Sequence, residues 1–215
     1  YIYHGLRSTE GLVEIFLNDF GVKISKTSVH NIIVGEALGL KEEYYSILKA
    51  ALLNSIYVQV DDTKEIHNNQ NGYFTQIANE AFTWFAAHDS KNKITFLETL
   101  HAGKVTYLFN ETSVEYLKAK NVSGLPELAF NILYDTKEKF QKYINSLEIN
   151  NKATLRYLEE AALFTSLINM NIPLDMFIMS DDAGQFNIFK RILCWIHVER
   201  NIKKLSHIAD DFKEE

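Results

Sequence analysis

Hydrophobic positions repeat at helical spacing along the first fifty residues. Four of them follow an i, i+3, i+4, i+7 pattern that ends at Gly21: Val13, Phe16, Leu17 and Phe20. A second stripe starts after Ser25 and Thr27, which are good helix caps: Val29, Ile32, Ile33 and Ala37. Two helices joined by a short turn are the outline of a DNA-reading helix-turn-helix, but any helical hairpin shares it.

The hydrophobic period changes from helical to alternating after residue 55. Residues 56–60 alternate and are followed directly by Asp61 and Asp62, which predicts a strand with carboxylates at its end. Residues 73–78 and 81–86 predict two further strands, joined by a turn at Asn79 and Glu80. Three successive strands with short connections predict an antiparallel meander.

The second half of the chain alternates between helical and strand patterns. A helix is expected between Ser90 and Gly103, and residues 110–170 are largely helical. A strand over residues 175–180 is followed by a second acid pair, Asp181 and Asp182. A helical segment over 185–190, a short strand over 192–196 and a helical tail from His197 complete the pattern.

Composition narrows the class of protein. The 215 residues are 47% hydrophobic and 23% charged, which is typical of one large or two small globular domains. One cysteine, Cys194, excludes an internal disulfide framework and favours a reducing compartment, and no apolar run reaches the roughly 20 residues of a membrane span. Because the chain begins with Tyr1 rather than Met, we expect it to be a piece of a longer protein.

Charge is unevenly distributed along the chain. The net charge of −6 argues against a general polyanion binder. Residues 183–207 nevertheless carry one acid, Glu199, and five basic residues: Lys190, Arg191, Arg200, Lys203 and Lys204. This basic strip is either a DNA-phosphate contact or a solvated helix face.

The two Asp-Asp pairs are the strongest candidates for chemistry. Carboxylates at the ends of neighbouring strands can hold hard cations such as Mg²⁺, and two such ions can catalyse phosphoryl transfer. Paired carboxylates also serve glycoside hydrolysis, and an Asp after a strand is often a turn residue. Cys194 and His197 could bind zinc or form a nucleophilic dyad. A structural zinc site usually has four ligands, so buried packing of these two residues is the simpler interpretation.

The order of three strands, helix, strand, helix and strand is that of a ribonuclease H-like core. Residues 56–205 resemble bacterial insertion sequence 66-like transposases of the DDE type. The matching stretches are Val60-Asp61-Asp62-Thr63, Asn71-Gly72-Tyr73, Trp84-Phe85, Ser90–Leu100, Ser180-Asp181-Asp182-Ala183-Gly184-Gln185-Phe186 and Leu193-Cys194-Trp195-Ile196-His197-Val198-Glu199-Arg200. The second acid motif, followed by Cys-x-x-His, is the most specific of these.

The resemblance implies an α/β protein with a ribonuclease H-like mixed sheet flanked by helices. Its regions would be a helical segment over 1–54 and a catalytic core over 55–215, with a helical insertion at about 110–170. Asp61 and Asp181 would be catalytic acids of a two-metal Mg²⁺ or Mn²⁺ site. Asp62 and Asp182 lie beside them, and Cys194 and His197 match the Cys-x-x-His motif.

The implied activity is hydrolysis and strand transfer at DNA phosphodiesters. Partners would be the terminal repeats of the element and its target DNA, with a homo-oligomer as a further candidate assembly and no membrane. The expected location is the bacterial cytoplasm, at the nucleoid. A third acid, a Glu on a later helix, is expected beyond Glu215. The alternatives are a catalytically inactive DNA-binding or assembly remnant and an unrelated ribonuclease H-like nuclease.

Overall fold

The computed structural model describes residues 10–67 and 70–211. The chain forms two compact units, Tyr1–Ile47 and Leu48–Glu215, and the division falls within helix α4 (Lys41–Asn54). Across the described residues, no helix is both long enough and apolar enough to cross a bilayer. Asn68 and Asn69, part of the expected turn cluster, lie outside the described residues, as do Glu214 and Glu215.

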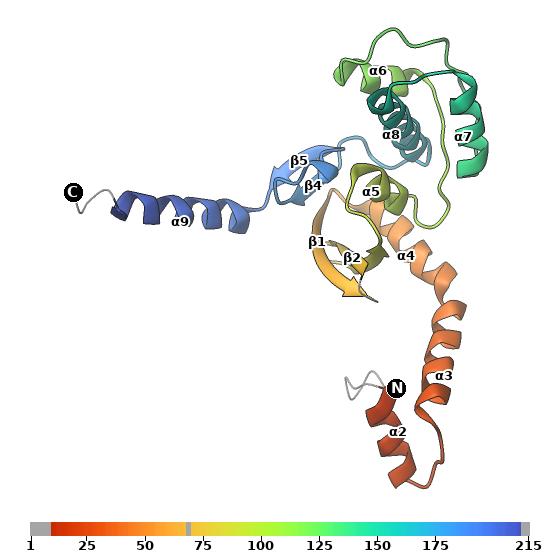
Figure 1. The fold of residues 1–215 in the computed structure, drawn as a ribbon, viewed down its shortest axis with the longest axis vertical. Coiled ribbons are helices and arrows are strands. Elements are labelled where there is room, and N and C mark those ends of the chain that lie inside the picture. The colour runs from red at the N-terminus through yellow and green to blue at the C-terminus, as the bar shows by residue number, and fades with distance from the viewer. Residues whose placement is uncertain (1–9, 68–69, 212–215) are drawn as a thin grey trace. The chain divides into compact units, whose positions relative to one another are not determined.

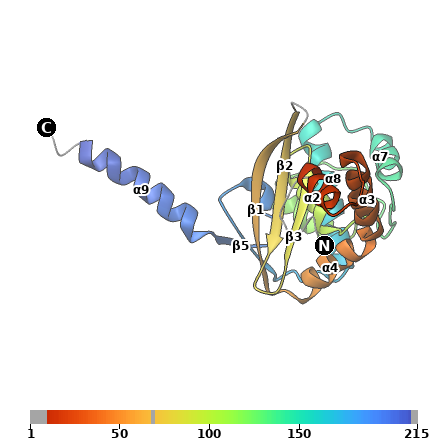
Figure 2. The same ribbon diagram turned by 90° about the horizontal axis from the view of Figure 1, so that it is seen from below.

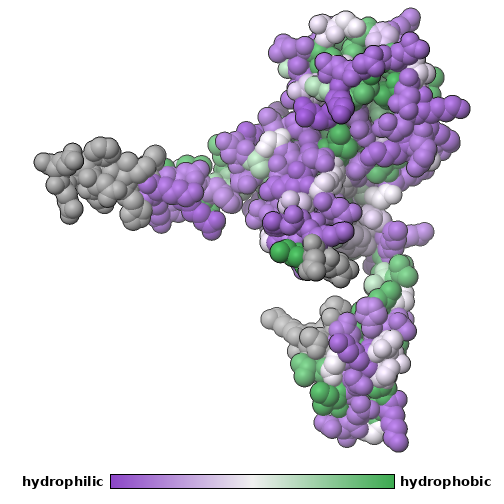
Figure 3. Space-filling view, viewed as in Figure 1, coloured by the Kyte–Doolittle hydropathy of each residue, from purple (hydrophilic) through white to green (hydrophobic). Residues whose placement is uncertain are grey.

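The first unit contains the two helices that the stripes predict, α2 (Glu10–Asp19) and α3 (Lys26–Gly39). Gly21 has a φ of 77°, a left-handed conformation that ends α2 at the expected place. The Ser25 side chain caps α3 by accepting a hydrogen bond from the Ser28 amide. Many apolar side chains of this unit remain on its surface (Figure 3), among them Leu12, Ile15, Phe20, Ile32 and Leu38.

The second unit is built on a five-stranded mixed sheet. Its strands are β1 (Tyr57–His67), β2 (Gln70–Ala78), β3 (Thr83–His88), β4 (Phe177–Ser180) and β5 (Lys190–Leu193). Their spatial order is β3-β2-β1-β4-β5. The β1–β2 and β2–β3 pairs are antiparallel, which confirms the meander, and β1–β4 and β4–β5 are parallel (Figure 1).

Helices flank this sheet, so the expected α/β class is correct. They are α5 (Lys93–Leu100), α6 (Glu111–Ala119), α7 (Lys137–Ser146), α8 (Lys152–Asn169) and the short 3₁₀ helix η1 (Gly184–Phe186). The last helix, α9 (Trp195–Asp211), projects away from the sheet (Figure 1). Figure 2 shows α7 and α8 on the same side of β1, β2 and β3. The fully buried side chains include Leu97, Leu100, Leu158, Leu163 and Leu167. Burial of these leucines stabilises the unit by about 1.5–3 kcal/mol each.

The sheet has one covered face and one open face. Side chains alternate across a strand, so Val58, Val60 and Asp62 share one face of β1 while Gln59 and Asp61 share the other. Val58, Val60, Ile77, Trp84 and Ile178 are buried on the covered face. Gln59, Asp61, Phe74, Gln76 and Phe85 are exposed on the open face.

Two expected boundaries are wrong. Asp61 and Asp62 lie inside β1, because antiparallel pairing with β2 continues to His67 and supplies backbone hydrogen bonds beyond the acids. The last strand ends at Leu193, and Trp195 and Ile196 already belong to α9. The amides of His197 and Val198 donate to the carbonyl of Cys194, so the chain turns into a helix immediately after the cysteine.

Candidate active site

Asp61 lies on β1, and Asp181 is the residue that follows the neighbouring strand β4. The parallel pairing of β1 with β4 ends at Gln59 opposite Met179. Asp61 and Asp181 each follow two residues later, so both side chains project from the open face. Adjacent strands are about 4.8 Å apart, which brings acids that are 120 positions apart in sequence to one point of the sheet.

Both acids line one cleft of about 280 Å³. Three further residues singled out by sequence line the same cleft: Cys194, His197 and Arg200. The cleft also has uncharged walls: Gln59, Val60, Gln76, Ala78, Met179, Ser180 and Ile196. The fold thus brings the acids, the Cys-x-x-His segment and one arginine of the basic strip together at the end of β4.

Each carboxylate is held at one oxygen by the backbone. Asp61 Oδ1 accepts from the Asp62 amide at 2.9 Å, and Asp181 Oδ1 accepts from the Ala183 amide at 3.1 Å. Among the residues whose side chains the structure describes, no group donates to Oδ2 of either acid. Each acid therefore presents one anchored oxygen and one oxygen that is free to bind a ligand.

This donor set fits a hard cation. Carboxylate oxygens are the ligands that Mg²⁺ and Mn²⁺ prefer, and water completes their coordination when the protein supplies one or two carboxylates. In the described part of the chain, no three His, Cys, Asp or Glu side chains are grouped as ligands of one ion. The two carboxylates that line the cleft, Asp61 and Asp181, are the candidate ligands for such an ion.

The cysteine and histidine are positioned by the junction between β5 and α9. The Cys194 amide donates to the Ser180 carbonyl at 2.8 Å, which ties the start of α9 to the end of β4. His197 follows in the first turn, and Arg200 lies one turn further along the helix. His197 lines the cleft, and its Nδ1 is buried without a hydrogen-bond partner among the described residues.

Asp62 has a different environment from its neighbour Asp61. Its side chain lies on the covered face and is 4% exposed. It accepts a short hydrogen bond from Thr75 Oγ1 and a 3.0 Å hydrogen bond from Gln185 Nε2, and Lys91 Nζ lies 3.9 Å away. These contacts fasten β1 to β2 and to η1, so Asp62 stabilises the strand that carries Asp61.

Asp182 and the basic strip are dispersed over several surfaces. Asp182 is 82% exposed and forms an ion pair with Arg191. Lys190 and Arg191 project from opposite faces of β5 because neighbours along a strand alternate, and Lys190 Nζ lies 5.5 Å from the Phe177 ring. On α9, Lys203 pairs with Glu199 at 2.8 Å, and Lys204 is exposed. Sequence proximity alone therefore does not make these five residues one surface.

Two glutamines that line the cleft, Gln59 and Gln76, are not among the site residues predicted from the sequence. Gln59 precedes Asp61 by two residues, so strand alternation alone places it on the same face. Gln76 lies opposite Asp61 in the β1–β2 register. That partnership depends on the exact position at which the hairpin turns, and the asparagine-rich turn signal over residues 68–72 does not fix that position to one residue.

Comparison with known proteins identifies a distant relative. The chain is 32% identical over 167 residues to the uncharacterized protein y4jO of Sinorhizobium fredii. The alignment covers 74% of this chain and 51% of the relative, so the chain spans about half the length of the curated relative it matches. No family model matches the chain, and no solved structure matches it.

Proposed function

We propose that this chain carries the paired-aspartate part of a metal-dependent DNA phosphoryl-transfer site on a ribonuclease H-like core. The observation that carries the proposal is that Asp61 on β1 and Asp181, directly after the adjacent strand β4, line one cleft. The sequence-based expectation of such a core comes from the order of elements along the chain, and the parallel pairing of β1 with β4 adds to it. Together with the motif resemblance, it favours a DDE-type transposase that acts on the DNA of the bacterial nucleoid.

The cleft's own residues suit this chemistry. Asp61 and Asp181 would hold Mg²⁺ or Mn²⁺, which supplies activation of an attacking oxygen and stabilisation of a leaving oxygen at phosphorus. The Arg200 guanidinium lines the cleft and would orient a phosphate oxygen through its fork of N–H donors. His197 Nδ1, buried and unpartnered among the described residues, would accept a proton or a hydrogen bond from substrate.

The proposal is tested by cleavage of labelled duplex DNA that carries the element's terminal repeat. The full-length protein is incubated with this DNA and Mn²⁺, and nicks are read on a denaturing gel. Asp61→Asn and Asp181→Asn should each remove cleavage while leaving the melting temperature unchanged. Asp182→Asn is the matched control, because Asp182 is exposed and lies outside the cleft lining.

Three outcomes would count against the proposal. Equal cleavage by all three variants would show that Asp61 and Asp181 are not needed for cleavage. DNA binding without cleavage by the full-length protein would leave a DNA-binding remnant as the function. Preference for an RNA–DNA hybrid over terminal-repeat DNA would instead identify a ribonuclease H-like nuclease.

A further inference from the structure

A second, larger cleft lies between α5 and α8. It measures about 790 Å³, and we call it the α5–α8 groove. Its lining combines polar residues at the start of α5, the residues Gly184 and Gln185 of η1, and charged residues from four segments. Five of the lining residues are cationic: Lys91, Lys93, Lys120, Lys137 and Arg156. Three are acidic: Glu98, Glu159 and Glu160.

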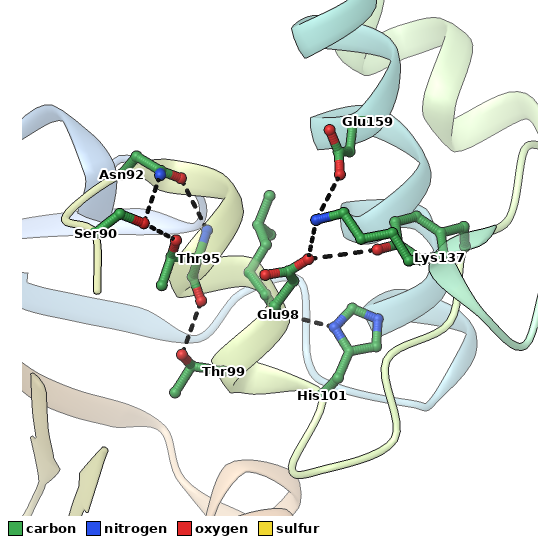
Figure 4. Close-up of polar contacts among 10 residues, drawn as sticks. Ser90, Asn92, Thr95, Glu98, Thr99, His101, Lys137 and Glu159 are labelled. Carbon is green, nitrogen blue, oxygen red and sulfur yellow. Dashed lines mark hydrogen bonds and ion pairs between the residues drawn. The ribbon is translucent and has the colours of Figure 1, made fainter. Parts of the chain in front are cut away.

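Each of the three acids already has a cationic partner within the protein. Lys137 Nζ lies 2.9 Å from Glu98 and 3.3 Å from Glu159, so one lysine is shared by two carboxylates (Figure 4). Glu160 accepts from the Tyr116 hydroxyl at 2.9 Å and lies 3.5 Å from Arg156 Nε. These contacts occupy Lys137 and one edge of Arg156, and none of the three acids forms an ion pair with Lys93 or Lys120.

Lys93 and Lys120 are the uncompensated charges of the α5–α8 groove. In the part of the chain that the structure describes, neither forms an ion pair or a hydrogen bond, although Lys120 Nζ lies 5.5 Å from the Tyr116 ring. Burial lowers the pKa of Lys93, and repulsion from Lys120 and Arg156 lowers it further. Attraction to Glu160 acts in the opposite direction. An anion bound in the groove would reduce the repulsion between like charges that line it.

Neutral donors line the same groove beside these lysines. At the start of α5 the Ser90 and Thr95 hydroxyls are 2.8 Å apart, and the Asn92 amide donates to Ser90 at 3.0 Å (Figure 4). Lys91 and Gln185 also line the groove, and both reach Asp62, the neighbour of Asp61. Two residues of the groove therefore contact β1, the strand that carries Asp61. Its volume exceeds that of one phosphate group many times over.

We propose that the α5–α8 groove binds the phosphodiester backbone of a DNA strand through Lys93, Lys120 and Arg156. The assignment of DNA rests on the proposed function. The binding site itself is separate from the Asp61–Asp181 cleft, so it supplies affinity rather than chemistry. Cations that have no internal partner and lie in an open groove are the usual contacts of nucleic-acid phosphates.

The test is binding of fluorescently labelled duplex DNA by anisotropy, in EDTA and at several salt concentrations. Lys93→Gln/Lys120→Gln should weaken binding about tenfold at 0.1 M salt and lower the salt slope by about two, since each phosphate contact contributes about 0.9. Lys49→Gln/Lys142→Gln is the matched control, because both lysines are exposed and neither lines the groove. Equal loss in the two double variants, or no loss in either, would overturn the proposal.

Two further measurements keep the result interpretable. Single Lys93→Gln and Lys120→Gln variants should each show part of the loss, and removing like charges should leave the melting temperature unchanged or higher. Phosphorus NMR with inorganic phosphate distinguishes a strand from a free anion. Saturable phosphate binding that the double variant loses, with DNA affinity unchanged, would contradict a strand site. Because binding is read in EDTA, failure of Mn²⁺-dependent cleavage does not affect the result.

Discussion

The two faces of the sheet use neighbouring, chemically identical residues for opposite purposes. Asp61 projects from the open face into the 280 Å³ cleft with one carboxylate oxygen unpartnered among the described residues. Asp62 projects from the covered face, where Thr75, Gln185 and Lys91 surround it. The pleat of the strand alone separates these roles, because it turns successive side chains to opposite sides. A buried carboxylate with several partners stabilises the fold, whereas an accessible one is able to bind a ligand.

The largest predicted difference in stability between the two faces is for two adjacent aromatic residues on β3. Trp84 is 5% exposed on the covered face, and Phe85 is 51% exposed on the open face. We expect Trp84→Ala to lower the free energy of unfolding by about 3–5 kcal/mol. Phe85→Ala should cost less than about 1 kcal/mol. Urea unfolding of both variants measures the difference, and comparable losses would mean that the open face is packed in solution.

The acid pair on β1 gives the next largest effect. Asp62→Ala leaves Thr75 and Gln185 without their acceptor, so we expect a loss of about 1–3 kcal/mol in the free energy of unfolding. Asp61→Ala removes one exposed carboxylate and should change that free energy by less than about 0.5 kcal/mol. Chemical denaturation again provides the measurement. A larger loss for Asp61 than for Asp62 would contradict the division between the two faces.

The pH dependence of unfolding tests whether His101 is buried in the folded protein. His101 is buried at the end of α5, and burial lowers its pKa from the ordinary 6.5. Below pH 6.5 the unfolded chain binds a proton that the folded chain resists, so stability falls as the pH drops through the lowered pKa. We expect the free energy of unfolding to decrease between pH 7 and pH 5, as measured by urea unfolding at each pH.

The control for this titration is the His101→Gln variant. Its free energy of unfolding should vary less between pH 7 and 5 than that of the wild type. Burial also lowers the pKa of His88, which therefore contributes in the same direction in both proteins. Parallel pH profiles for the two proteins would show that His101 is not the group responsible.

The smallest expected effect is at the surface. Arg191 pairs with Asp182, whose side chain is 82% exposed. Exposed ion pairs contribute between about 0 and 1 kcal/mol, and salt weakens them further. Asp182→Ala should therefore shift the denaturation midpoint only slightly, and less at high salt. A loss above about 2 kcal/mol, well beyond the range of exposed pairs, would mean that Asp182 has a role like that of Asp62.

Much of the fold follows from the hydrophobic pattern. Alternation over residues 56–60, 73–78 and 81–86 predicts the meander, and the helical stripes predict α2, α3, α7 and α8. The length of β1 does not follow from its own residue pattern, because its extension depends on hydrogen bonds from β2. The end of β5 at Leu193 cannot be predicted from the sequence either. The apolar residues Trp195 and Ile196 fit the pattern of a strand as well as that of a helix.

The candidate site is predictable in part. The two Asp-Asp pairs at strand patterns identify Asp61 and Asp181, and the Cys-x-x-His spacing identifies Cys194 and His197, all of which line the cleft. Alternation also separates Lys190 from Arg191. The proximity of Lys93 and Lys120 is beyond sequence reasoning, because it arises only when α5 and the end of α6 face the same groove.

The most direct test of the paired-aspartate assignment is Mn²⁺ binding, followed by electron paramagnetic resonance of the free ion. Three matched Asp→Asn variants at positions 61, 181 and 62 are compared with the wild type. We expect Asp61→Asn and Asp181→Asn each to weaken Mn²⁺ binding more than about tenfold, because ligands matter at least as much as their supporting residues. Asp62→Asn should bind Mn²⁺ within about threefold of the wild type, since Asp62 does not line the cleft. Unchanged binding in Asp61→Asn, or an equal loss in all three variants, would contradict the account.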